Sequence, residues 1–180
     1  DGGGFGFSLS GQGETLGIWD AGGVRLTHEE FPGRATQGDS PGGLHNHATH
    51  VAGTMMAAGV DADAKGMAYQ SDLVAFDWNN DLGEMTDAAA QGLRVSNHSY
   101  GFITGWHLDD GDWYWYGNTN ETQAFGFGYY GGTSYNWDML AYDAPHYLIV
   151  KAAGNDRGSG PASQPVAHYV KNGETWEVDN

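Results

Sequence analysis

The chain has 180 residues, of which 23 are acidic and seven are basic, and its net charge of −16 would repel phosphate backbones and anionic membrane surfaces. We therefore expect neither nucleic acid nor a membrane as a partner, and no apolar run approaches the roughly 18 residues of a membrane-spanning helix. The sequence has no cysteine, which excludes disulfides, thiolate metal sites and a cysteine nucleophile, and its 30 glycines favour a loop-rich globular protein over a helical bundle.

Strands and helices are predicted to alternate along the chain. Residues 1–14 are glycine-rich and irregular, and residues 15–19 form a short buried strand that ends at Asp20. The later elements are, in chain order, a loop at 32–46, a helix at 49–58 with His47 at its entrance, a strand within 68–78, a helix at 84–93, a strand through Val95 and Ser96, a helix at 137–142 and a strand at 147–153. Between the last two strands, residues 102–135 are rich in tryptophan, tyrosine and glycine and indicate a surface insertion without regular elements.

This alternation predicts an α/β fold, a doubly wound and mainly parallel sheet with helices on both faces. Functional sites in such sheets collect beyond the carboxyl ends of the strands. Asp20, the segment 99–101 and Asn155 each follow a predicted strand end, and His47 opens a helix. One edge of the sheet could therefore gather all four.

The run His-Ala-Thr-His-Val-Ala-Gly-Thr at residues 47–54 resembles the histidine motif of subtilisin-like serine proteases, His-Gly-Thr-His-Val-Ala-Gly-Thr. Ala48 stands where the family has glycine. The resemblance implies that His47 is a general base that accepts the proton of a serine nucleophile, and that His50 is a structural neighbour within the helix.

Three further segments resemble parts of the same family. Ile-Trp-Asp-Ala-Gly at 18–22 is similar to its Asp-Ser/Thr-Gly turn, which implies that Asp20 orients His47. Ala-Ala-Gly-Asn at 152–155 is similar to the segment of its oxyanion asparagine, which implies that role for Asn155. The segment 95–101 is similar to the strand that pairs with the substrate backbone, and the residues implied in substrate binding are Ser99, Tyr100, Gly101 and Gly154.

The nucleophilic serine of the family has no counterpart after Asn155. Its Gly-Thr-Ser-Met/Ala pattern is absent there, and Gly132-Thr133-Ser134 precedes Asn155 and is typical of a helix N-cap. The resemblance thus covers roughly residues 15–158 and implies that residues 1–180 are the N-terminal portion of one peptidase domain, with an incomplete fold. A C-terminal remainder, joined covalently or present as a nicked second chain, would supply the serine, so the 180 residues alone are predicted to be inactive.

The family implies a polypeptide substrate and a secreted or extracellular protein, in the periplasm or at the cell surface in some settings. A start at Asp1 in place of methionine suggests a processed or trimmed product. Triad catalysis needs no cofactor. The Asp-Asp-Gly-Asp run at 109–112 has the oxygen-rich composition of a structural calcium loop, but its spacing is not that of an EF-hand and favours a solvated acidic turn, so no metal ligands are assigned.

Two other classes of function fit parts of the sequence. His-Asn-His-Ala-Thr-His at 45–50 nearly matches the His-x-His-x-Asp-His zinc motif of metallo-β-lactamase-like hydrolases, although Thr49 stands where that motif has aspartate. The aromatic residues of the insertion could instead stack on a glycan or peptide in a non-catalytic relative, although loop packing is the commoner role of such residues.

Overall fold

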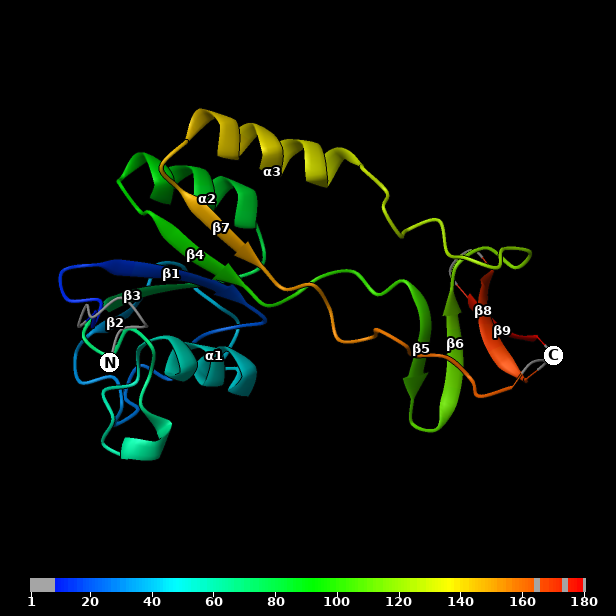
Figure 1. Cartoon of the computed structure of the whole chain (residues 1–180), viewed down its shortest axis with the longest axis horizontal. Coiled ribbons are helices and arrows are strands. Elements are labelled where there is room, and N and C mark those ends of the chain that lie inside the picture. The colour runs from blue at the N-terminus through cyan, green and yellow to red at the C-terminus, as the bar shows by residue number, and fades with distance from the viewer. Residues whose placement is uncertain (1–8, 164–165, 173–174, 180) are drawn as a thin grey trace. The chain divides into compact units, whose positions relative to one another are not determined.

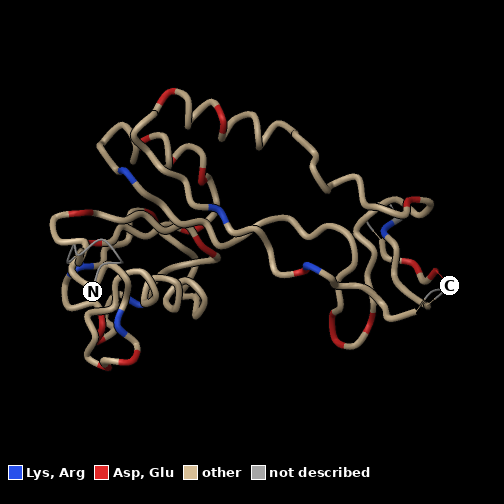
Figure 2. Tube along the Cα trace, viewed as in Figure 1, with Lys and Arg blue, Asp and Glu red and all other residues tan. Residues whose placement is uncertain are grey.

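A computed structural model describes residues 9–163, 166–172 and 175–179, so most of the predicted irregular N-terminal segment lies outside the described residues. The chain divides into two compact units. The first consists of Asp1–Tyr100 with Asn136–Ala152, and the second consists of Gly101–Tyr135 with Ala153–Asn180. Acidic residues are distributed over both units, whereas lysine and arginine are few (Figure 2).

The first unit is built on a five-stranded, wholly parallel sheet with the strand order β2-β3-β1-β4-β7. Its strands are β1 (Thr15–Asp20), β2 (Ala35–Gln37), β3 (Asp72–Asp77), β4 (Val95–His98) and β7 (Leu148–Lys151). Helix α1 (Asn46–Met56) lies on one face, and α2 (Asp81–Ala90) and α3 (Gly132–Asp143) lie on the other (Figure 1). The predicted doubly wound α/β fold is therefore confirmed.

Alternating side chains divide the core of this unit into two layers. Ile18 and Trp19 are neighbours on β1 and both are fully buried, but they point to opposite faces of the sheet. The layer beneath α1 contains Ile18, Leu73, Ala75, Ala48, Ala52 and Met56. The layer beneath α2 and α3 contains Trp19, Phe76, Met85, Leu93 and Leu140. Residues of β1 pack in both layers and residues of α1 pack in the first, so the core fixes the positions of these two elements.

Several predicted boundaries are wrong by a few residues. Helix α1 starts at Asn46, so His47 lies inside its first turn and not at its entrance. Sequence patterning missed the start of this turn because Asn46 and His47 are polar and exposed. Helix α2 spans 81–90 in place of 84–93, since the left-handed Asn80 precedes it and Gly92, with a φ of 96°, follows its end. Strand β2 lies within the predicted loop at 32–46.

The second unit is a four-stranded sheet with the order β5-β6-β8-β9, composed of β5 (Gly105–Asp109), β6 (Asp112–Tyr116), β8 (His168–Asn172) and β9 (Thr175–Asp179). The prediction of an irregular segment at 102–135 is therefore wrong. Asp110 and Gly111 both have positive φ, 48° and 93°, as a two-residue hairpin turn of type I′ requires. The acidic run at 109–112 thus forms the tip of the β5–β6 hairpin.

No helix among the described residues combines the length and the apolar character needed to cross a lipid bilayer.

The carboxylate of Glu30 fixes the chain that leaves α1. Glu30 is 7% exposed, and its two oxygens accept hydrogen bonds from the backbone N–H groups of Gly59, Val60 and Asp61 at 2.7, 3.1 and 2.9 Å. These bonds, led by that of Asp61, hold the pKa of Glu30 below its usual 4.5 although burial opposes the shift. An ionised carboxylate therefore anchors the C-terminal end of the helix that carries His47.

Replacing Glu30 with glutamine is expected to lower the Tm of the full-length protein by about 5 °C at neutral pH, because the amide group cannot accept all three bonds. Since the folded-state pKa is lowered, the contribution of the carboxylate is present above pH 4.5 and is lost as the pH falls through the lowered pKa. Thermal unfolding followed by circular dichroism should thus show a Tm difference that narrows in acid. The exposed neighbour Glu29, changed to glutamine, is the control, and an equal loss in that variant would contradict the anchor role.

Candidate active site

Asp20 and His47 form a hydrogen-bonded pair at the carboxyl end of β1. The Nδ1 atom of His47 lies 2.7 Å from Oδ1 and 2.9 Å from Oδ2 of Asp20. Asp20 is 1% exposed, whereas about half of the His47 side chain is exposed. Because a carboxylate can only accept, His47 carries a proton on Nδ1, and its Nε2 lone pair is left to accept a proton from another group.

Backbone contacts between two loops bring this pair together. The N–H of Gly23 donates to the carbonyl of Gly43 at 2.8 Å, and the N–H of His45 donates to the carbonyl of Gly23 at 2.8 Å. These bonds hold the start of α1 against the turn that follows β1. A Cβ atom on Gly22 would meet the Gly43 carbonyl oxygen at 3.1 Å, so the close approach of the loops favours glycine there.

The methyl group of Ala48 is accommodated without displacing His47. Ala48 is fully buried and belongs to the core layer beneath α1. Its Cβ packs toward the sheet, while the ring of His47 turns toward Asp20. The difference from the glycine of the family motif therefore adds buried apolar contact at the start of the helix.

The predicted substrate-binding segment follows β4 and lies beside the end of β1, where Asp20 is. Gly17, Ile18 and Trp19 pair with Ser96, Asn97 and His98, and this register continued by one residue aligns Asp20 with Ser99. The side-chain amide of Asn97 donates to the hydroxyl of Ser99 at 2.8 Å. Ser99 thus lies in the first unit together with Asp20 and His47.

The remaining predicted site residues divide between the two units. Tyr100 lies in the first unit, where its hydroxyl donates to Asp81 at 2.7 Å. Gly101, Gly154 and Asn155 belong to the second unit. Gly154 has a φ of 95°, a conformation that favours glycine, and Asn155 is exposed.

The structure also contains a Ser–His pair that sequence reasoning missed. The hydroxyl of Ser96 lies 2.7 Å from Nε2 of His98, as in a nucleophile and its base, but both residues are fully buried. No substrate carbonyl can reach this hydroxyl, so the pair is structural. The signal for it in the sequence is polar residues at 96, 98 and 100, which an alternating strand places on one face.

Ser134 lies in the first turn of α3, which begins at Gly132. The prediction that residues 132–134 cap a helix starting at 137 is therefore wrong, because the helix extends further toward the N-terminus.

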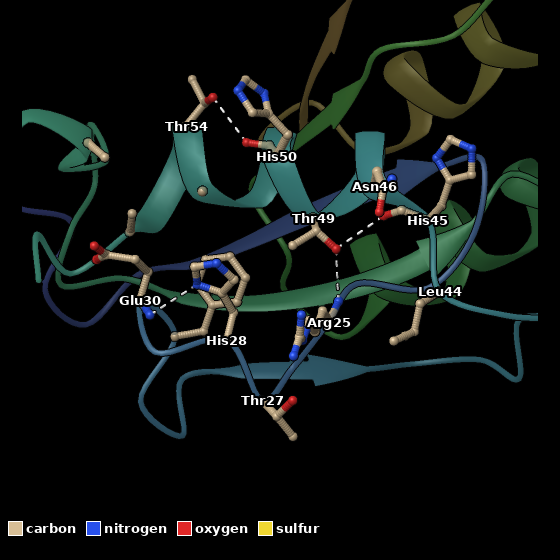
Figure 3. Close-up of a pocket in the computed structure, with 14 residues that line it drawn as sticks. Arg25, Thr27, His28, Glu30, Leu44, His45, Asn46, Thr49, His50 and Thr54 are labelled. Atoms are coloured by element: carbon tan, nitrogen blue, oxygen red, sulfur yellow. Dashed lines mark hydrogen bonds between the residues drawn. The ribbon is translucent and has the colours of Figure 1, made fainter. Parts of the chain in front are cut away.

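The three clustered histidines point in different directions. The rings of His45 and His47 are 6.4 Å apart, and His47 is engaged by Asp20. His45 and His50 line a pocket of about 880 Å³ on the outer side of α1, and Figure 3 shows them there with His28 and Glu30. Among residues 9–163, 166–172 and 175–179, no three His, Cys, Asp or Glu side chains are grouped to hold a metal ion. His47 and Asp20 do not line the pocket.

Comparisons with known proteins agree with the fold. The fold is similar to that of the patellamide maturation protease PatA, with 21% identity and a TM-score of 0.54 over 83% of this chain and 51% of that chain. It is also similar to a cold-adapted subtilisin-like serine proteinase, with 19% identity and a TM-score of 0.51 over 85% of this chain and 50% of that chain. The chain thus spans about half the length of these proteins.

A search of curated proteins found no match. The sequence model of the subtilase family matches residues 21–177, nearly the whole chain, and the chain therefore belongs to the subtilase family of serine proteases.

Proposed function

We propose that this chain is the N-terminal part of a serine endopeptidase domain that cleaves extended polypeptides. The observation that carries the proposal is the hydrogen bond between Asp20 and His47 in a member of the subtilase family. In the proposed reaction, Nε2 of His47 accepts the proton of a serine hydroxyl as that oxygen attacks the scissile carbonyl. Buried Asp20 holds the reactive tautomer and stabilises the imidazolium that forms. His47 then returns the proton to the leaving amine.

The substrate would bind as an extended strand beside the end of β4. Main-chain groups of Ser99 and Gly101 are suited to pair with a peptide backbone, which gives affinity independent of the peptide's side chains. Asn155 would donate its side-chain amide to the oxyanion of the tetrahedral intermediate, with Gly154 beside it. Loss of one such donor typically lowers turnover by about 10² to 10³. No step in this proposal requires a cofactor.

The serine would come from a C-terminal remainder of the same domain. Strand β7 is an outer strand of the parallel sheet, and its side chains Leu148 and Val150 are 59% and 44% exposed. An outer strand with exposed apolar side chains favours pairing with further chain. The half-length coverage of the structural neighbours supports this partner. We also propose that the protein is secreted, in keeping with its net charge of −16.

Labelling of the full-length protein with a fluorophosphonate tests the proposal. Peptide mapping by mass spectrometry should locate the label on a serine C-terminal to residue 180, and peptidase activity should disappear in step with labelling. Label on Ser96 or Ser134 would refute the assignment of the nucleophile. Peptidase activity that survives labelling and is lost to a zinc chelator would refute the serine mechanism and favour the zinc hydrolase.

A further inference from the structure

A chain of hydrogen bonds runs through the core beneath α2 and α3. The hydroxyl of Tyr147 donates to Ser96 at 2.6 Å, and Ser96 lies 2.7 Å from Nε2 of His98. Nδ1 of His98 lies 3.0 Å from the hydroxyl of Tyr100, which donates to Oδ2 of Asp81 at 2.7 Å. Five side chains, from β4 and the residues just after it, from α2 and from the residue before β7, thus form one connected relay, defined as Tyr147, Ser96, His98, Tyr100 and Asp81.

The carboxylate of Asp81 sets the direction of every bond in the relay. Because Asp81 can only accept, Tyr100 uses its proton there and must accept from Nδ1–H of His98. Nε2 of His98 then has only a lone pair, so it accepts from Ser96. Burial lowers the pKa of His98 to about 3 and raises the pKa of Tyr147 to about 12, which keeps these groups neutral between those limits. The relay therefore has a single arrangement near neutral pH.

Several further contacts hold Tyr100 in place. Its hydroxyl is bonded on both sides, and the ammonium group of Lys151 lies 3.7 Å from the centre of its ring. The same ammonium group donates to the backbone carbonyl of Tyr100. His98, two residues earlier, stacks on Trp19 at 5.2 Å between ring centres. The hydroxyl, the ring and the main chain of Tyr100 are thus all held by neighbouring groups.

The relay uses the side chains on one face of residues 96–100. The side chains on the opposite face take no part in it. Ser96, His98 and Tyr100 alternate with Asn97 and Ser99, which therefore face the α1 side. Asp20 faces that side too, because it has the same parity on β1 as Ile18 of the α1 core layer. The fixed face is therefore opposite the one that carries the Asp20–His47 pair.

We propose that the relay and Lys151 position the segment 99–101 for an extended substrate, and that Tyr100 contributes through its anchored main chain and not as a pocket-lining side chain. This inference rests on the proposed function of the segment. An unanchored segment would sample several conformations, and a peptide would have to order it on binding. An anchored segment avoids this ordering cost.

The test replaces Tyr100 with phenylalanine in the full-length protein, which cuts the relay but keeps the ring under Lys151. We expect KM for a tetrapeptide amide to rise about tenfold while kcat stays within about twofold, because the loss of anchoring weakens binding of the peptide and leaves the Asp20–His47 pair intact. Tyr142→Phe is the matched control, since Tyr142 is 80% exposed. A fall in kcat with KM unchanged would show a defect in the catalytic pair and would overturn the positioning role.

Amide hydrogen exchange in the same variants separates this inference from the proposed function. Exchange at Ala152, whose N–H donates to the carbonyl of His98 at 3.1 Å, should accelerate about tenfold in Tyr100→Phe and remain unchanged in Tyr142→Phe, with the amides of β1 and β3 unaffected in both. Unchanged exchange at Ala152 would overturn the inference, whatever the activity. A wild-type protein without peptidase activity would refute the proposed function, and accelerated exchange would then still support the anchoring of the segment.

Discussion

Replacing His47 with alanine is expected to lower kcat of the full-length protein on peptide substrates by about 10⁶-fold while leaving KM within a few-fold. The imidazole is the only group placed beside Asp20 among the described residues that can accept a serine proton. Without it, the attacking hydroxyl keeps its proton, and only the binding of substrate and oxyanion remains to accelerate the reaction. Steady-state kinetics with an extended peptide amide measure the loss.

The control for this variant is His50→Ala. His50 lies one helical turn further along α1, is exposed, and lines the outer pocket without contacting Asp20. Its loss should change kcat by less than about twofold, since no step uses it. A loss similar to that of His47→Ala would indicate that the histidine cluster acts as a unit, as a metal site would require, and would contradict the proton-transfer role of His47 alone.

The elements that place the candidate site were predictable because they depend on local patterns. Strand β1 is a short apolar run that ends at Asp20, and α1 repeats buried residues at 48, 52 and 56. Both patterns can be read within a dozen residues. The resemblance of residues 47–54 to a family motif then supplied the pairing of His47 with Asp20, which are 27 positions apart.

The second unit was not predictable by the same means. Strand β6 has four aromatic residues in succession, Trp-Tyr-Trp-Tyr at 113–116, so the alternation that marks a half-buried strand is missing. Its neighbour in the sheet, β8, lies more than 50 residues later in the chain. A strand pairing over such a separation leaves no local signal in a single sequence.

The relay in the first unit was also not predictable from the sequence, because it joins distant parts of the chain. Ser96, His98 and Tyr100 form a visible alternation of polar residues, but Asp81 and Tyr147, which satisfy them, come from distant parts of the chain. Sequence reasoning placed Tyr100 in the substrate-binding segment without any indication that its hydroxyl is hydrogen-bonded to Asp81. Only the assembled core shows that this side chain is already bonded on both sides.

Replacing Asp20 with asparagine is expected to lower kcat by about 10⁴-fold without unfolding the protein. Asparagine has nearly the same shape, but its amide nitrogen would donate to Nδ1 of His47 and move the ring proton to Nε2. A protonated Nε2 cannot accept from the serine. Asp72→Asn is the control, because Asp72 is an exposed carboxylate at the start of the neighbouring strand β3, and its activity should be unchanged.

The double variant Asp20→Asn/His47→Ala decides whether the two residues act as a unit. If Asp20 works only through the ring of His47, the double variant should be no slower than His47→Ala alone, so the two losses must be strongly non-additive. Independent contributions would instead multiply to about 10¹⁰-fold, a loss below the activity that substrate and oxyanion binding alone would leave. A further fall of even tenfold beyond His47→Ala would show that buried Asp20 supports the site by another route, such as the hydrogen bond it accepts from the N–H of Ala21 at 2.8 Å.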